Sequence, residues 1–579
     1  HTVIGRGGLT PSFTRATTET GQKWGETGYL DFTALAGEMV FKGARRERNF
    51  LLGSTEDFSN ASWQKLQGGT GTVPVVTGGQ TDPLGGATAT RLQMNAGDGT
   101  AANYSLLRNN PNVTITPLMQ FWVKSNTGST QTVCVGNPGG GGPSRIPVTV
   151  TTAWTPVVRT VGTYAAGTAW DFLVGGGLGG SNILDILVWH PQLNDITGET
   201  DQTTIRPYVS VGVASAPAYH GSMVDGVKCF DTDRSGNPIA ASTLKGYLAE
   251  PAATNLCLQS ADLGTTWTNN NTTESTNATT APDGTTTADK LIEAATNTSH
   301  TIHNTVAGTS GVYTTSVYLK AAERTWAYIT EGNSVTATAY FNLANGVVGT
   351  VNGTGSPSSK IVDVGGGWYR CSMTFTAGAN ANIQIGTSTG DTISTFLGDI
   401  TKGIYVWGAQ LELGSAATSY IPTTTVAVAR NADVLTYPSA GNIDGTVGWC
   451  YAEYSTLGSN PNARVIGCGD TASANTVLFA SPTAGSKASI YDGTASVSST
   501  GVMSAVNTVV NGATTWGGST MSACADGETP VSGAFDGNIA LTGGIGIGVG
   551  GSVPWNGHIG NVRIGHRQLS NSELQAITR

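Results

Sequence analysis

The stretch ILVWHPQL at residues 186–193 returns as IYVWGAQL at residues 404–411, and this repetition decides the fold. The agreement extends back along the chain from both stretches. The same landmarks (an Asn followed by an apolar residue, an Asp followed by an apolar residue, then a Trp) occur at 49–63 and again at 255–267. The loops between matched landmarks differ in length, while the expected strands occur in the same order. One module therefore occurs twice, which favours repeated binding or added length over a single catalytic constellation.

Composition predicts an all-β protein. The chain has 579 residues, which is too long for one core, and 80 of them are glycine while only 12% are charged. Short apolar runs alternate with clusters of Gly, Asn, Asp, Ser and Thr, and Thr315, Val317 and Leu319 would point to one side of a strand. We therefore expect tandem jelly-roll or β-sandwich modules followed by a further β-sandwich of another kind.

The repeat also predicts where the domains lie. The two modules are expected at residues 50–212 and 255–432, and an unrepeated C-terminal domain at 433–579. Residues 1–49 and 213–254 form an N-terminal segment and a connector that resemble each other. The repeating unit is therefore a connector followed by a module.

Charge, hydropathy and cysteine content exclude several classes of partner. A net charge of -9 argues against nucleic acid, and no run of about twenty apolar residues predicts membrane insertion. The chain opens at His1 without an initiator Met or a signal peptide, so we expect an N-terminal piece to be missing or removed. Seven cysteines without close pairing predict free thiols in a reducing cytoplasm. The alternative is one disulfide among Cys450, Cys468 and Cys524.

Longer motifs carry a resemblance to known families. NFLLGSTEDFSNASW (49–63) and IYVWGAQLELGSAATSYIPT (404–423) resemble the repeated modules of bacteriophage fibre and spike proteins, which are similar to jelly-roll carbohydrate-binding modules. WNGHIGNVRIGHRQLSNSELQAI (555–577) resembles the end of concanavalin-like (laminin-G-like) lectin domains.

The resemblance implies an appendage exposed on the surface of a virion, assembled in the host cytoplasm. It implies a host-surface carbohydrate as ligand, bound without being cut, and other virion proteins as partners through the N-terminal segment. A homo-oligomer, most simply a trimer, is expected because exposed sheet edges need covering. The alternatives are a purely structural virion protein without a ligand and a tailspike that depolymerises polysaccharide.

Aromatic residues outside the repeat are the candidates for sugar binding. Trp326 and Tyr328 lie two apart, hence on one face of a strand, where the first module offers only Thr132 and Cys134. Two further candidates, Trp516 and Trp555, stand in loops expected to be rich in Gly, Thr and Ser. The alternative for all four aromatic residues is a place in the core. That second interpretation is preferred for tryptophans present in both copies, such as Trp189 and Trp407.

Neither a cofactor nor a metal is expected. Asp231, Asp233 and Ser235 have the opening spacing of a calcium loop, but Ser242 stands where a bidentate Glu belongs. A hairpin turn is the preferred interpretation there. Glu453 lacks the partner acid that a glycosidase needs, and the chain has no Gly-x-Ser-x-Gly, phosphate-binding or dinucleotide motif, so we do not expect an enzyme.

The C-terminal domain carries two more expectations. Its chain end should form a short helix capped by Ser570, with Leu574 and Ile577 facing inward. As the one unrepeated unit, it is expected to lie farthest from the N-terminal segment and to do most of the binding.

Overall fold

The computed structural model describes most of the chain as strands. The described residues are 12–14, 19–25, 28–34, 41–42, 45–98, 103–113, 115–136, 145–160, 170–177, 179–196, 199, 201–213, 225–230, 246–332, 335–378, 380–458, 463–468, 476–481, 486–501, 508–541, 544–548 and 555–579. Within them the one α-helix is α1 (Asn571–Ile577), so the all-β expectation is confirmed. The chain divides into two compact units, Arg45–Asn237 and His1–Ala44 with Pro238–Arg579.

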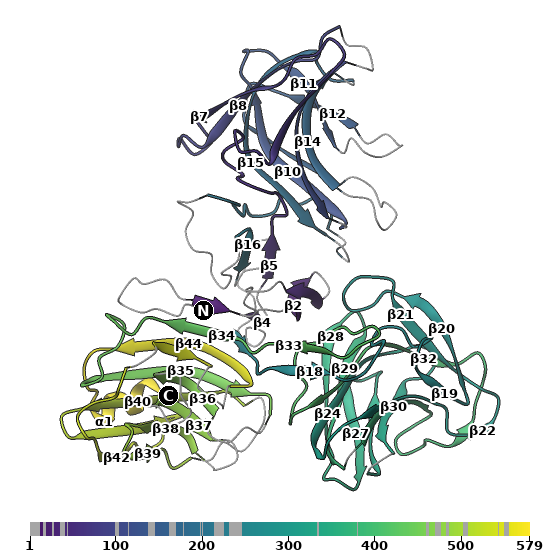
Figure 1. Cartoon of the computed structure of the whole chain (residues 1–579), viewed down its shortest axis with the longest axis vertical. Coiled ribbons are helices and arrows are strands. Elements are labelled where there is room, and N and C mark those ends of the chain that lie inside the picture. Colours follow the sequence, from purple (N-terminus) through teal and green to yellow (C-terminus); the bar gives the residue numbers. More distant parts are fainter. Residues whose placement is uncertain are drawn as a thin grey trace. The chain divides into compact units, whose positions relative to one another are not determined.

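Module 1 is a sandwich of two five-stranded antiparallel sheets within the first unit (Figure 1). Apolar side chains from both sheets, including Phe121, Phe172 and Val188, fill the space between them. One sheet has the order β13 (Thr155–Thr160), β10 (Pro117–Ser125), β15 (Ile183–Asp195), β8 (Ala89–Asn95) and β7 (Val75–Gln80). The other has the order β12 (Arg145–Val150), β11 (Gln131–Gly136), β14 (Trp170–Gly177), β9 (Tyr104–Val113) and β6 (Trp63–Gly68).

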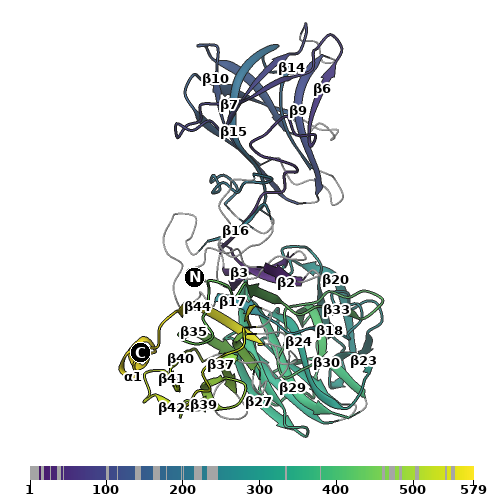
Figure 2. The same ribbon diagram turned by 60° about the vertical axis from the view of Figure 1, so that its left-hand side comes forward.

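Module 2, teal to green in Figure 2, has the same strand order as module 1, with one more edge strand in each sheet. Ile302, Phe341 and Phe375 lie in the core between its sheets. The first sheet runs β28 (Ser358–Gly365), β29 (Trp368–Ala377), β24 (Gly311–Ala321), β32 (Gly403–Leu413), β21 (Ala288–Glu293) and β20 (Thr272–Thr279). The second runs β27 (Val347–Gly353), β26 (Ala337–Asn342), β25 (Trp326–Glu331), β30 (Asn380–Ser388), β23 (Thr301–Ala307) and β19 (Thr268–Asn270).

The register of the central strands matches between the modules as well. Trp122 pairs with Trp189 in module 1, and Tyr318 pairs with Trp407 in module 2. Both ladders shift register at the same point, just before these pairs. The residue after each Trp has a left-handed backbone, with φ of 51° at His190 and 63° at the matching glycine, Gly408. The predicted repeat of one sandwich is therefore confirmed strand by strand.

Buried polar contacts repeat too. Asn255 donates to the carbonyls of Ala409 and Ile421 and accepts from the amides of Cys257 and Leu411. Asn49 makes the same four contacts in module 1, with Pro191, Val209, Leu51 and Leu193. Each Asn side chain binds four backbone groups and thereby joins the beginning of its module to the end. The two copies are therefore held together by the same contacts.

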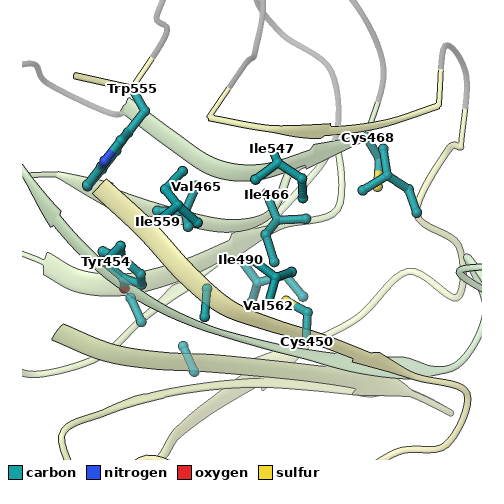
Figure 3. Close-up of a cluster of buried hydrophobic side chains, with 14 of the residues drawn as sticks. Cys450, Tyr454, Val465, Ile466, Cys468, Ile490, Ile547, Trp555, Ile559 and Val562 are labelled. Carbon is teal, nitrogen blue, oxygen red and sulfur yellow. The ribbon is translucent and has the colours of Figure 1, made fainter. Parts of the chain in front are cut away.

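The C-terminal domain is a sandwich of two seven-stranded sheets, and its core includes Tyr454, Ile466 and Ile559 (Figure 3). One sheet runs β4 (Phe41–Lys42), β17 (Gly246–Ala249), β44 (Gly557–Gly565), β35 (Gly448–Thr456), β40 (Val510–Gly517), β41 (Thr520–Ala525) and β42 (Val531–Ala534). The other runs β1 (Ser12–Thr14), β34 (Val434–Tyr437), β43 (Ile545–Ile547), β36 (Ala463–Cys468), β37 (Thr476–Ser481), β38 (Ser486–Tyr491) and β39 (Ser496–Ser498).

Three strands of this domain come from segments that the sequence assigned elsewhere. β1 and β4 belong to the N-terminal segment and β17 to the connector, yet β1 pairs with β34 and β17 pairs with β44. They supply partners for backbone groups that would otherwise be unpaired at sheet edges. The expectation that the C-terminal domain lies farthest from the N-terminal segment is therefore wrong. Because β4 pairs with β17, module 1 is an insertion between two neighbouring strands of the C-terminal sandwich.

A buried ion pair marks the passage from the connector into module 2. β18 (Ala253–Asn255) pairs with β33 (Val428–Arg430), and Arg430 Nη1 lies 3.1 Å from Glu250 Oε2, both side chains being almost fully buried. The Glu250 amide donates to the Asp433 carboxylate, and the Asp433 amide donates to the Glu250 carbonyl. Shorter pairs complete the described strands: β5 (Arg45–Arg48) with β16 (Val227–Phe230), β2 (Glu19–Gly25) with β3 (Gly28–Ala34), and β22 (Asn297–Thr298) with β31 (Phe396–Leu397).

Helix α1 follows the sequence prediction closely. The Ser570 side chain accepts from the backbone of Glu573, and the Glu573 side chain accepts from the backbone of Ser570. Leu574 is buried and Ile577 packs beside it against β40 and β41, where Figure 2 shows the helix. The capping box and the inward apolar residues hold the chain end on the sheet.

Candidate functional site

Trp326 and Tyr328 lie on the outer face of the six-stranded sheet that holds β25. Ala327 and Ile329, which alternate with them, point into the core of module 2. Strand alternation therefore places Trp326 and Tyr328 together on the opposite face. Tyr340 of β26 joins them there, because its neighbours Ala339 and Phe341 are core residues. We call Trp326, Tyr328 and Tyr340 the aromatic stripe.

Glycines allow the stripe to lie close to the sheet. Tyr328 pairs with Gly386, and a Cβ at Gly386 would come within 2.3 Å of the Tyr328 ring. The rings of Tyr328 and Tyr340 are 5.4 Å apart with a 35° angle between their planes. Burial raises the pKa of Tyr328 above its usual value, so its hydroxyl stays protonated and able to donate.

Trp326 is the most accessible member of the stripe. It is half-buried, whereas Tyr328 is 3% and Tyr340 5% exposed. The Trp326 ring lies against Gly349, and Asp391 lies against the same glycine. Asp391 accepts two hydrogen bonds of 2.8 Å, from the backbone and the hydroxyl of Thr350, which fix its carboxylate beside the indole.

The indole nitrogen distinguishes Trp326 from the core tryptophans. Trp189 and Trp407, the repeated pair, each donate to a threonine hydroxyl, at 2.7 and 3.1 Å. Among the described residues, Trp326 has no hydrogen-bond partner for its indole nitrogen. A partly accessible aromatic ring whose N–H is available can stack on a flat apolar group and also bind an oxygen of the same molecule.

Polar side chains border the stripe along the sheet. His303, Gln384, Thr330 and Thr338 follow one another across four strands in the next row. Thr330 and Thr338 bind each other at 2.8 Å, while His303 Nδ1 is buried without a partner among the described residues. The face therefore combines aromatic surface with hydroxyl, amide and imidazole groups.

Module 1 has no aromatic stripe at the matching place. The corresponding strand, β11, carries Thr132 and Cys134 on that side, and Cys134 is fully buried. Gly175 takes the place of Gly386, but the space above it holds the side chain of Leu106. The break in the repeat that singled out Trp326 and Tyr328 therefore corresponds to a real difference between the two faces.

The two loop candidates in the C-terminal domain are core residues, which corrects the sequence interpretation. Trp516 is fully buried on β40, and its indole donates to the carbonyl of Asp444. Trp555 is also fully buried, edge-on to Tyr454 at 5.5 Å, and donates to the carbonyl of Ser455 (Figure 3). A ring with both faces packed against protein cannot stack on a sugar, so neither residue is assigned to ligand binding.

Sequence reasoning missed Tyr340. Its signal was present in the alternation of AYF at 339–341, where an aromatic residue faces away from two apolar neighbours. The pairing of β26 with β25 could not be read from the sequence, so nothing indicated that Tyr340 would lie beside Tyr328.

The remaining predictions concern a calcium site, the cysteines and membrane insertion. Asp231, Asp233 and Ser235 lie outside the described residues. Over the described ranges, no group of three or more His, Cys, Asp or Glu side chains could hold a metal ion. None of the seven cysteines forms a disulfide, Cys450, Cys468 and Cys524 included, as the first interpretation expected. In the same ranges no helix has the length and apolar character needed to cross a membrane.

Comparison with protein-family models finds no match for this chain, and comparison with curated proteins finds none either.

Proposed function

We propose that this protein is a bacteriophage virion appendage, a fibre, spike or decoration, that binds host-surface carbohydrate without cutting it. The resemblance of both modules to phage fibre and spike modules supports the virion assignment. Its location would be the particle surface, after assembly in the host cytoplasm. Tandem sandwiches supply length and several copies of a binding fold, which suits weak sites that gain strength from multiple display.

The observation that carries the binding part is the half-buried Trp326, whose indole N–H has no partner among the residues that the structure describes. The C–H face of a pyranose ring is flat and apolar, and its hydroxyls need donors and acceptors. The indole ring can stack on the apolar face of the sugar. The Asp391 carboxylate can accept from a sugar hydroxyl, and the indole N–H can donate to one. Tyr328 and Tyr340 extend the same face of the sheet beside Trp326.

The assembly part of the proposal is a homo-oligomer, with a trimer as the simplest form, that also contacts other virion proteins through its N-terminal segment. Oligomerisation covers exposed sheet edges and places several aromatic stripes on one particle. Native mass spectrometry of the full chain is expected to give three times the mass of one chain. A single species of 59.3 kDa would contradict the oligomer.

A glycan array tests the binding function directly. The full chain is expected to bind at least one host-surface glycan, and Trp326→Ala is expected to weaken that signal strongly. Thr132→Ala, at the matching place of module 1, is the control and should bind as the unaltered chain does. Incubation with host polysaccharide should release no new reducing ends, and their appearance would identify a depolymerising enzyme instead.

A further inference from the structure

Two tryptophans lie outside the core of module 1, on the outer face of the sheet that holds β10 (Figure 1). Phe121 and Val123 of β10 point into the core. Trp122 and Lys124, which alternate with them, therefore lie on the outer face. Trp154 precedes β13, and its ring centre is 5.6 Å from Lys124 Nζ. Both tryptophans are half-buried, and within the described ranges no buried cluster includes or borders either of them.

In module 2 the matching residues are buried. Trp122 matches Tyr318 in the ladder beside the repeated tryptophans. Trp154 matches Trp368, since each ring lies beside the lysine two residues further along the matched strand. Tyr318 is 1% and Trp368 3% exposed, and both belong to a cluster with Val364 of β28. In the part of module 1 that the structure describes, β13 ends the sheet and no strand takes the place of β28.

The indole nitrogens differ between the modules in the same way. Trp368 donates to the carbonyl of Thr280 at 3.1 Å. Neither Trp122 nor Trp154 donates from its indole nitrogen to a described residue. Trp122 packs edge-on against Trp189, with ring centres 6.4 Å apart, so its position is fixed while its N–H stays available.

A further protein strand fits the edge of β13 poorly. Pro156 is the ladder partner of Trp122, whereas module 2 has Arg370 at this place, paired with Val362 of β28. Proline has no N–H to donate, and within sheets it is found on edge strands. A strand added beside β13 would lack this hydrogen bond. The open edge therefore favours a smaller ligand.

We call Trp122, Lys124, Trp154 and Pro156 the module 1 patch. Its members lie two apart along each of two neighbouring segments, so their Cα positions are about 7 Å apart along the chain and about 5 Å across. The pairing of Trp122 with Pro156 joins the two segments at one end of the patch. The contact of Lys124 with Trp154 joins them at the other end. A single pyranose can therefore touch an indole and the ammonium group at once.

The charges on this face favour an acidic ligand. Arg91 of β8 lies on the same face, and Asp185 accepts from it at 2.8 and 2.5 Å, so these two charges offset each other. Lys124 makes no ion pair within the described residues. Its distance from the Trp154 ring is near the outer limit of a cation–π contact, which leaves the ammonium able to bind a carboxylate.

We propose that the module 1 patch is a second carbohydrate site, which takes a pyranose bearing a carboxylate. The apolar face of the ring packs on Trp154, the carboxylate pairs with Lys124 Nζ, and the Trp122 indole donates to a hydroxyl. The inference rests on the proposed carbohydrate function and adds a site and a ligand class to it. The Asp391 carboxylate beside Trp326 disfavours such a ligand in module 2, so the two modules bind different sugars.

The test uses the full chain and ligand-detected NMR titrations with three probes: methyl glucuronide, methyl glucoside and acetate. It is carried out on the unaltered chain and on Trp326→Ala, which removes the module 2 site. We expect Trp326→Ala to bind the glucuronide at least ten-fold more tightly than the glucoside or acetate. Adding Lys124→Gln should remove this preference, and adding Trp154→Ala should weaken glucuronide binding at least ten-fold. Lys320→Gln, beside the buried Trp368, is the matched control and should leave it unchanged.

The outcomes separate the two proposals. If the glycan array gives a signal but Trp326→Ala does not bind the glucuronide, the module 1 site is wrong and the proposed function stands. Glucuronide binding that ignores both Lys124→Gln and Trp154→Ala overturns the module 1 site. Acetate binding as tight as that of the glucuronide also overturns it, because the ammonium group alone would then explain the binding. Absence of any array signal and of binding to either glycoside overturns both proposals.

Discussion

Single buried polar residues explain much of how each module closes. Asn255 is fully buried and satisfies four backbone groups, and Asn49 does the same in module 1. Likewise the hydroxyls of Tyr208 and Tyr420 each bind one hydroxyl near the start of their module, at 2.5 Å in both cases. These contacts join residues far apart in sequence, so their loss should act on a whole sandwich.

Asn255→Ala should therefore destabilise module 2 selectively. It would leave two backbone amides and two carbonyls without their partner in a site closed to water. We expect a loss of roughly 3–5 kcal/mol. Calorimetry of the full chain should show one unfolding transition at lower temperature, while Asn49→Ala should shift a different transition. If both variants shift the same transition, the modules do not close independently.

His190 gives module 1 a buried titratable group at the position where module 2 has Gly408. Its ring is stacked between Trp189 and Tyr208, with centres 3.4 and 3.5 Å away. Burial lowers the pKa of His190 from 6.5 to about 3, although Asp82 acts in the opposite direction. Glu56 Oε1, 3.8 Å from Nε2, does not offset the burial.

The sign of the effect follows from proton uptake. Below pH 6.5 the unfolded chain protonates His190, but the folded chain does not until pH is about 3. The free energy of unfolding of module 1 should thus fall as pH drops from 7 to 5, by at most about 1.4 kcal/mol per pH unit. His190→Gly, which copies Gly408 of module 2, should remove this slope in urea unfolding. If the free energy of unfolding of His190→Gly depends on pH as strongly as before, other titratable groups cause the dependence.

How far the sequence predicts the site is clearest at particular residues. Trp326 and Tyr328 could be found because they break a repeat, and the outer face of β25 carries both. Trp516 and Trp555 were misassigned because Gly, Thr and Ser around them suggested loops. Trp516 in fact lies on a strand, and a glycine on the neighbouring strand makes room for its ring: a Cβ at Gly448 would come within 2.5 Å of Trp516. A glycine beside an aromatic residue can mark close packing as well as a turn.

At the scale of elements, the repeat predicted that the two modules share one sandwich, and their matching strand orders confirm it. The extra edge strands β27 and β28 could not be foreseen, because nothing in module 1 corresponds to them. Helix α1 was predictable because its cap, its N3 glutamate and its apolar residues all lie within one short segment. Local signals suffice for an element of that kind.

The capping box of α1 gives an element-scale prediction. Ser570→Ala removes the side chain that accepts from the Glu573 amide, and should destabilise the C-terminal domain by about 1 kcal/mol. Ser572, exposed in the first turn, does not cap the helix, so Ser572→Ala is the matched control. Equal melting temperatures for the two variants would show that the helix end contributes nothing to the stability of the domain.

At the scale of the whole molecule, the chain is not a simple series of domains. Lys42 of β4 pairs with Gly246 of β17, so the chain leaves the C-terminal sandwich and returns to it at adjacent positions. Sequence order could not reveal this, because β1, β4 and β17 are short and carry no signal of their long-range partners.

Replacing residues 43–245 by a two-residue Asn-Gly turn should therefore leave the rest of the chain folded. The turn would join two residues that already face each other in an antiparallel ladder, as in a tight hairpin. Calorimetry should show the loss of one transition only, and residues 45–237 expressed alone should reproduce the lost one. Aggregation of the shortened chain would argue against the insertion.

The central claim is that the aromatic stripe of module 2 binds carbohydrate, and the affinity of Trp326 variants tests it most directly. Isothermal titration of the full chain with the oligosaccharide that gives the strongest array signal should show binding. Trp326→Ala should weaken this binding at least about ten-fold, equivalent to about 1.4 kcal/mol, and Thr132→Ala should leave it unchanged. Equal affinities for the unaltered chain and Trp326→Ala would contradict the account.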